Sequence, residues 1–216
     1  MFFEGRDEVP KTMRRLVRRL ERLKIPYAIL GGMALSAHRY RRTTLDLNVL
    51  LTPQGFSKFQ ELFVPKNHRR IPGRSRRFID RVNEVTIDFL ITGLYPGTGR
   101  PGPIAFPDPS KVSKVIGDRR VVDLVTLIQL KLAARRYRDF GDVVELIRFN
   151  ELTESFLDQL DPSVRGDFIE CLEEKRREDE YEARGGRNPR QGRGRITTQS
   201  IFPNSARSAA SIASSR

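Results

Sequence analysis

Three oxygen-bearing side chains interrupt two apolar segments of the chain. Asp46 and Asn48 lie two residues apart in segment 45–51, and Asp88 lies in segment 85–91. A carboxylate on a largely buried strand is costly unless it is paired with, or bound to, a cation. Oxygens from neighbouring strands would make a site for a hard cation such as Mg²⁺ that also takes substrate phosphates. The alternative is that these side chains face solvent from a half-exposed sheet.

A pair of glycines, Gly31 and Gly32, separates an apolar segment from a short helical one. Glycine at such a turn lets the backbone pass close to a phosphate, and the helix that follows offers free N–H groups. A plain tight turn would need the same two residues. The pair alone therefore does not decide between a phosphate site and a turn.

The spacing of apolar residues predicts the elements that must position these groups. Period-two and short apolar runs indicate strands at 25–30, 45–51, 76–81, 84–92 and 112–116. Three- and four-residue spacing indicates helices at 9–24, 33–40, 55–63, 124–137, 139–148, 153–160 and 163–183. Residues 93–109 are rich in glycine and proline and are expected to form a long loop. We therefore predict an α/β (α+β) protein with a mixed sheet flanked by helices and a helical C-terminal half.

Composition excludes several classes of protein. The 216 residues carry a formal net charge of +13, and about half of that excess comes from seven arginines in residues 184–216, which contain no acid. That segment is expected to be a disordered Arg/Gly/Ser-rich tail. A single cysteine excludes an intramolecular disulfide, and two histidines with one cysteine all but exclude a His/Cys zinc site. Without a long apolar run or a signal-peptide pattern, we expect a cytoplasmic protein with no membrane partner.

Basic residues gather around the predicted hairpin at 76–92. They are Arg69, Arg70, Arg74, Arg76, Arg77 and Arg81. An RNA acceptor would need phosphate contacts of this kind. The alternative is an ordinary solvated charged surface.

Four motifs together resemble the polymerase-β-type nucleotidyltransferase fold. Residues 31–38 and 42–48 resemble its opening, in which a strand, a glycine pair, a short helix and Arg-x-Thr-x-Asp-x-Asp follow one another, and Asp88 matches the third carboxylate on a later strand. Residues 124–135 and 138–142 resemble the helical half of the AbiEii-type branch, with its Leu-Lys helix and Arg/Lys-Asp-x-x-Asp. The resemblance covers residues 10–150, and the motifs stand in the expected order.

The resemblance implies an organisation and an activity. Residues 1–118 would form a nucleotidyltransferase-like α/β domain, residues 119–183 a helical region packed on it, and residues 184–216 the tail. The activity would be nucleotidyl transfer from an NTP to a hydroxyl acceptor, with tRNA or another RNA as the acceptor. Because the branch includes toxins of toxin–antitoxin systems, the resemblance also suggests a cognate antitoxin protein as a partner.

The resemblance also assigns roles to residues. Asp46, Asn48 and Asp88 would hold Mg²⁺ or Mn²⁺. The nucleotide would be bound by Gly31, Gly32, Arg42, Thr44, Lys131 and Asp139. Asp142 would act as the general base, so that Asp46, Asp88 and Asp142 form the catalytic set. The residues themselves leave other interpretations open: an exposed helix lysine for Lys131, solvation for Arg42, and helix capping for Asp139 and Asp142.

One departure from the family pattern affects the expected chemistry. The second carboxylate of the Asp-x-Asp pair is Asn48, whose amide oxygen can ligate a cation but brings no negative charge. Metal affinity and the two-metal arrangement should both weaken. The alternative to an enzyme is therefore a catalytically weakened protein that binds a nucleotide or RNA.

Overall fold

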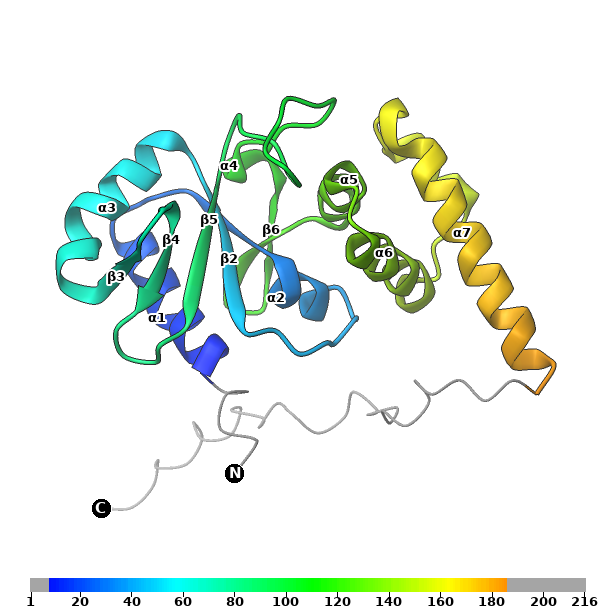
Figure 1. Ribbon diagram of the computed structural model, residues 1–216, viewed down its shortest axis with the longest axis horizontal. Coiled ribbons are helices and arrows are strands. Elements are labelled where there is room, and N and C mark those ends of the chain that lie inside the picture. Colours follow the sequence, from blue (N-terminus) through cyan, green and yellow to red (C-terminus); the bar gives the residue numbers. More distant parts are fainter. Residues whose placement is uncertain (1–7, 186–216) are drawn as a thin grey trace, which may run out of the picture. The chain divides into compact units, whose positions relative to one another are not determined.

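The computed structural model describes residues 8–185. Seven strands form one mixed sheet: β1 (Tyr27–Leu30), β2 (Asp46–Leu51), β3 (His68–Ile71), β4 (Arg74–Asp80), β5 (Thr86–Ile91), β6 (Ser113–Ile116) and β7 (Arg119–Val122). Their order across the sheet is β3-β4-β5-β2-β1-β7-β6. Strands β2 and β5 lie side by side near the middle (Figure 1), and they run parallel.

Helices flank the sheet and make up the region that follows it. The helical elements are α1 (Glu8–Arg22), α2 (Gly31–Ala37), α3 (Pro53–Asn67), α4 (Pro109–Val112), α5 (Leu124–Ala134), α6 (Tyr137–Asn150), the 3₁₀ helix η2 (Glu154–Gln159) and α7 (Pro162–Ala183). The described residues up to Asp179 belong to one compact unit, and Glu180 begins a second. This architecture confirms the predicted α/β fold with a mixed sheet and a helical C-terminal half. None of the helices within residues 8–185 combines the length and apolarity that crossing a bilayer requires.

Two strands escaped prediction. β3 and β7 each contain two adjacent arginines, so their sequences lack a run of apolar residues. In β3, at the edge of the sheet, both arginines are exposed, whereas β7 buries only its two valines. The predicted strand at 112–116 begins one residue later, after the short helix α4, and the predicted helix at 153–160 is 3₁₀ rather than α. Most of the predicted tail, from residue 186 on, lies outside the described residues.

The two faces of the central strands differ in character. Leu47, Val49 and Phe89 are fully buried, and Phe59 of α3 packs against Phe89 with ring centroids 4.4 Å apart and the rings tilted by 47°. The residues between them along β2 and β5 point to the opposite face because strand side chains alternate. The apolar face is therefore covered by helix, and the other face carries the polar side chains of both strands together with Leu50 and Leu90.

His68 is a buried histidine at the start of β3, packed against the ring of Phe59 at a centroid distance of 5.1 Å. Neither ring nitrogen has a hydrogen-bond partner, and Nδ1 lies 4.0 Å from Oδ1 of Asp80. Burial lowers the pKa of His68 to about 4, although the Asp80 carboxylate acts in the opposite direction. The imidazole is therefore neutral in the folded protein at pH 7.

His68 should make stability fall between pH 6.5 and pH 4. In that window the unfolded chain binds a proton that the folded chain excludes, so protonation favours unfolding by up to about 3 kcal/mol. We expect His68→Leu to flatten this part of the pH profile in urea unfolding followed by circular dichroism. An unchanged profile in the variant would contradict the assignment, and Asn67→Ala provides a control at the adjacent position.

Candidate functional site

A cavity of about 470 Å³ opens over the polar face of the sheet. Its walls come from the end of β1, from Asn48 of β2, from β4 and β5, from residues 95–99 of the long loop, and from α5 and α6. Five cationic residues line it, against two acidic ones, Asp88 and Asp139. The cations are Arg74, Arg76, Arg77, Lys131 and Arg136. The cavity therefore suits an anionic ligand.

The register of β2 and β5 places the candidate metal ligands on one face. Asn48 pairs with Asp88, and Asp46 pairs with Thr86. Paired residues of neighbouring strands share a face, and so do residues two apart on one strand. Asp46, Asn48 and Asp88 therefore project to the same side of the sheet. Asn48 and Asp88 line the cavity, whereas Asp46 is not among its lining residues.

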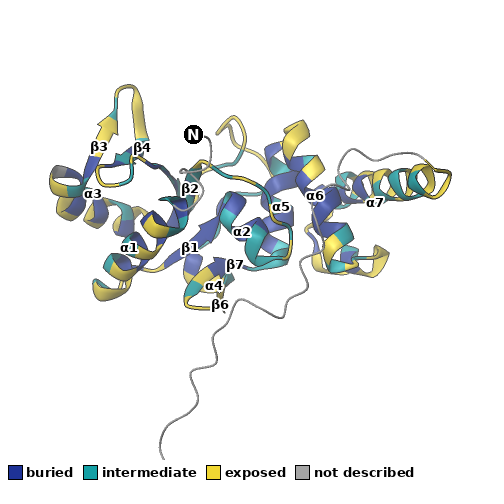
Figure 2. Cartoon of the chain, turned by 90° about the horizontal axis from the view of Figure 1, so that it is seen from below, coloured by how far each residue is buried: buried dark blue, intermediate teal, exposed yellow. Residues whose placement is uncertain are grey.

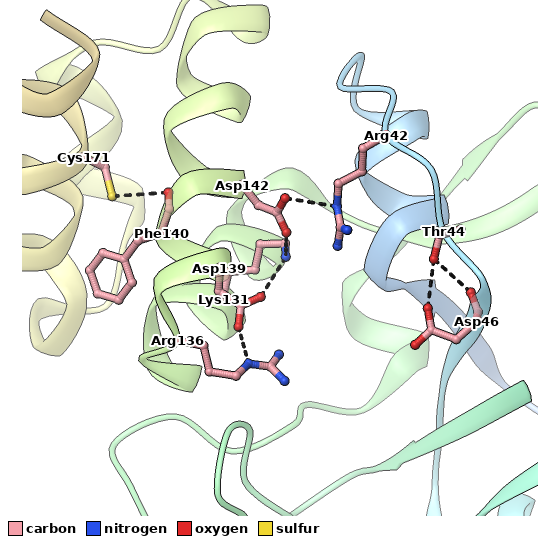
Figure 3. Close-up of polar contacts among 9 residues, drawn as sticks. All are labelled: Arg42, Thr44, Asp46, Lys131, Arg136, Asp139, Phe140, Asp142 and Cys171. Atoms are coloured by element: carbon pink, nitrogen blue, oxygen red, sulfur yellow. Dashed lines mark hydrogen bonds and ion pairs between the residues drawn. The ribbon is translucent and has the colours of Figure 1, made fainter. Parts of the chain in front are cut away.

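Asp46 is positioned by the loop that precedes its strand. The hydroxyl of Thr44 donates to Oδ1 of Asp46 over 2.8 Å and lies 3.2 Å from the Asp46 carbonyl oxygen (Figure 3). The structure thus gives Thr44 a role in orienting a carboxylate. A direct contact of Thr44 with phosphate stays a prediction.

Asp88 already has a cationic partner. Arg77 lies opposite it in the antiparallel β4–β5 pair, and its guanidinium donates to Oδ2 of Asp88 over 2.6 Å. This hydrogen bond, together with the charge of Asp88, raises the pKa of Arg77 above its ordinary value. The ion pair reduces the negative charge that Asp88 can offer to a bound cation.

The glycine pair packs tightly against the same elements. Gly31 has a φ of +63°, and a Cβ there would lie 2.6 Å from Nδ2 of Asn48. A Cβ on Gly32 would lie 2.6 Å from Cβ of Thr44. The structure therefore gives both glycines a packing role beside the candidate ligands, and the phosphate role stays a prediction.

A buried network of charges joins α5, α6 and the loop before β2 (Figure 3). The ammonium of Lys131 lies 3.0 Å from Oδ1 of Asp139 and 2.6 Å from Oδ2 of Asp142. Arg136 pairs with the other oxygen of Asp139, and Nε of Arg42 lies 3.1 Å from Oδ1 of Asp142. Three cations thus enclose two carboxylates.

This network excludes two of the simpler interpretations. The side chain of Lys131 is only 8% exposed, so it is not an exposed helix lysine. The residue at the N-cap of α6 is Arg136, which makes no side-chain cap, so Asp139 and Asp142 do not cap the helix. Arg42 does pair with a carboxylate. Nε2 of His38 lies 2.7 Å from the carbonyl oxygen of Val122.

The network keeps the carboxylate of Asp139 charged. Burial by itself would raise the pKa of Asp139, but the nearby Lys131 and Arg136 outweigh it and hold the pKa below its usual range. Both oxygens of Asp142 face a cation. A general base needs an oxygen free to take a proton. The role predicted for Asp142 would thus require one of its partners to move away.

The candidate donor set holds too few carboxylates for two hard cations. Among residues 8–185, no cluster of three His, Cys, Asp or Glu side chains is arranged to hold a metal ion. Asp46, Asn48 and Asp88 supply two carboxylates and an amide oxygen on one face. Mg²⁺ takes oxygen ligands and commonly keeps water and substrate phosphates in its shell. Such a set suits a single ion that shares its shell with a phosphate.

Some residues of the cavity were not assigned to it from the sequence. The sequence left Arg74, Arg76 and Arg77 either as phosphate contacts for an RNA acceptor or as a solvated charged surface, and all three stand in the cavity wall. Tyr95 lies in the wall too, on the long Gly/Pro-rich loop. The length of that loop was the available signal, but which residue it brings to the cavity depends on tertiary packing. A Cβ on Gly97 would lie 2.6 Å from the carbonyl oxygen of Ala134, so the loop rests closely on the end of α5.

No protein-family model matches the chain, and no curated protein matches its sequence. Among solved structures, JHP933 from Helicobacter pylori is 14% identical, with 86% of this chain and 97% of that one covered and a TM-score of 0.46. An antigenic nucleotidyltransferase-like protein from Paracoccidioides brasiliensis is 14% identical over 83% of this chain and 92% of its own, with a TM-score of 0.47. ANT(2")-Ia in complex with adenylyl-2"-tobramycin is 13% identical over 81% and 97%, with a TM-score of 0.42. Identities of 13–14% and TM-scores below 0.5 carry no argument about the function of this chain, which therefore rests on its site.

Lys131 should be essential to the stability of the site. We expect Lys131→Met to lower the free energy of unfolding by about 3–5 kcal/mol, because two buried carboxylates lose their shared cation. Urea unfolding at pH 7 measures this. Arg136→Gln removes an exposed partner of the same Asp139 and should cost less than about 1 kcal/mol. An equal decrease in the free energy of unfolding in the two variants would contradict the role of Lys131 as the main cation of this network.

Proposed function

We propose that this chain is a metal-dependent nucleotidyltransferase that binds an NTP in the cavity and transfers its nucleotidyl group to a hydroxyl acceptor. One observation carries the proposal. The register of β2 with β5 sets Asn48 beside Asp88, with Asp46 on the same face, at a cavity whose walls are mainly cationic. Oxygen ligands and phosphate-binding cations at one place are what a metal-bound triphosphate requires.

Asp46, Asn48 and Asp88 would hold Mg²⁺ or Mn²⁺. When bound, the ion supplies charge neutralisation for the triphosphate and for the departing pyrophosphate. The acceptor oxygen forms a bond to the α-phosphorus, the bond from that phosphorus to pyrophosphate breaks, and the hydroxyl proton passes to a carboxylate. We assign that carboxylate to Asp142, which would turn one oxygen away from Arg42 or Lys131 to accept it.

The cationic side chains have separate tasks in this proposal. Arg74 and Arg76 in the cavity wall would bind phosphate oxygens, while Arg77 would exchange Asp88 for a phosphate when the ion enters. Lys131 would reach the phosphates only by giving up a carboxylate, so its main task is to hold Asp139 and Asp142 in place. Gly31 and Gly32 would let the triphosphate approach the backbone.

We propose RNA, with tRNA as the first candidate, as the acceptor. The basic strands β3 and β4 support this, because exposed Arg70 lies in the same hairpin as Arg74 and Arg76, next to Arg69, which pairs with Glu84. Membership of the AbiEii-type branch, and an antitoxin protein as partner, are proposals that rest on the order of the sequence motifs.

A second function is favoured by two features of the site. Asn48 replaces a carboxylate, and Arg77 neutralises Asp88. With both in place the chain could bind a nucleotide or RNA without transferring anything. This candidate differs from the first in its prediction for turnover, not for binding.

Turnover separates the two candidates. The full chain is incubated with α-³²P-labelled NTPs, Mg²⁺ and total tRNA, and label in RNA is measured on a denaturing gel. We expect label transfer that Asp46→Ala lowers by at least on the order of a hundredfold, because one of two carboxylate ligands is lost. Thermal stabilisation by NTP without label transfer would instead support the binding protein, and neither effect would exclude both.

Asn48→Asp should strengthen metal binding. The change restores a carboxylate at nearly constant volume, so we expect Mg²⁺ affinity to rise on the order of tenfold in a calorimetric titration. Asn67→Asp makes the same change of charge at the end of α3 and is the control. Equal Mg²⁺ affinity in the wild type and Asn48→Asp would refute the assignment of residue 48 as a ligand.

A further inference from the structure

The outer face of α1 carries a continuous row of cations. The six residues around a shallow hollow of about 570 Å³ on this helix are Lys11, Arg14, Arg15, Arg18, Arg19 and Arg22. They recur at three- and four-residue spacing, which places them along one side of the helix. None of the functions discussed above uses this row.

The row is held rigidly by the opposite side of the same helix. Met13, Leu16, Val17 and Leu20 are each at most 5% exposed and pack into the core. Figure 2 shows α1 with its buried side against the sheet and its exposed side turned outward. Because the helix is already ordered, a ligand that binds the row does not have to fix the backbone first.

Four of the six cations form no ion pair within the described residues, and one of the four, Arg19, lies over the ring of Phe63. Lys11 pairs with Glu8, and Arg15 pairs with Asp80. By contrast, Arg14, Arg18 and Arg22 form no ion pair with any residue of the described chain. Burial, with a smaller effect from the charge of Arg15, lowers the pKa of Arg19, although the Asp80 carboxylate acts in the opposite direction.

The nearby carboxylates are already engaged. Glu21 accepts a hydrogen bond from the hydroxyl of Tyr27, and Asp118, beside Arg14 and Arg18, pairs with Arg119. The row therefore presents an excess of positive charge that an external anion can neutralise.

The shape of the row selects a polymeric anion. From Lys11 to Arg22 the helix rises by about 16 Å at 1.5 Å per residue. That length exceeds one phosphate group and matches several successive phosphates of a nucleic acid, whose charges follow one another along its axis.

A lipid surface fits this helix less well. A helix that lies on a membrane inserts an apolar face among the acyl chains. In α1 the apolar face is buried in the core, and none of the exposed large hydrophobic residues of the described chain belongs to α1. Because α1 exposes no aromatic ring, it has no surface on which bases could stack. Contacts would therefore be to phosphates and independent of sequence.

The row faces away from the cavity. Tyr27 and Asp80 both contact α1. Tyr27 lies two residues before Ile29, which pairs with Val49 on the apolar face, and Asp80 lies two residues after Phe78, which pairs with Ile87 on that face. The helix thus covers the side of the sheet opposite to Asn48 and Asp88.

We propose that the outer face of α1, through Arg14, Arg18 and Arg22 above all, binds the sugar–phosphate backbone of a nucleic acid. This surface is separate from the cavity and does not depend on nucleotidyl transfer.

The test is fluorescence anisotropy with the full chain and a fluorescein-labelled 20-base-pair RNA duplex, without NTP or Mg²⁺. A DNA duplex of the same sequence is the second probe. We expect R14Q/R18Q/R22Q to weaken binding of both duplexes at least tenfold at 100 mM salt and to reduce the slope of log Kd against log salt by about 2–3. Circular dichroism and thermal melting check that the variant is folded.

The matched control is K175Q/R176Q/R177Q. It removes the same charge from one helix, but from cations that already pair with Asp179, Glu154 and Glu174. Affinity within about twofold of the wild type supports the proposal. Equal losses of duplex affinity in the two triple variants would show an effect of net charge alone and would overturn the proposal. It would also be overturned if R14Q/R18Q/R22Q lost binding to phosphatidylserine vesicles but kept its affinity for the duplexes.

Discussion

The parallel, in-register pairing of β2 with β5 determines which side chains can act together in this protein. Asn48 stands beside Asp88 only because the two strands match residue for residue. A slip of one residue would turn Asp88 toward Phe59 and the covered face, where a carboxylate would have no partner. The apolar residues that alternate with these groups fix the register, so the core and the site are specified by the same pairing.

Burial of charge is the second constraint, and it links the helical half to the sheet. Lys131 lies between two carboxylates, and Arg42 reaches the same cluster from the loop before β2. Such a network adds little net stability compared with apolar packing, but removing one member leaves a charge that the interior cannot solvate. Helices α5 and α6 are thereby held in one arrangement beside the cavity. A ligand that entered would have to compete with these ion pairs.

The sequence was sufficient for the elements whose apolar pattern is strong. β2, β5 and the α-helices other than α4 lie within a few residues of their predicted ranges, and Asp123 caps α5 by accepting from the N–H of Thr126. β3 and β7 could not be predicted from the sequence, because they contain no apolar run and are strands only through hydrogen bonds to a neighbouring strand. The burial of Lys131 also escaped, since it depends on a turn at Arg135 with a φ of 52° that folds α6 back against α5. The roles of Asp46, Asn48 and Asp88 in binding metal stay predictions.

The sheet also stands between the two surfaces that are proposed to bind nucleotides or nucleic acid. The cavity lies on one side, and the arginine row of α1 lies on the other. If α1 binds nucleic acid, a short oligonucleotide would occupy α1 alone, whereas a longer strand would have to pass the β3 edge, where Arg69 and Arg70 are exposed, to reach the cavity. The thickness of the protein would then set a minimum length for a nucleic acid that occupies both surfaces at once.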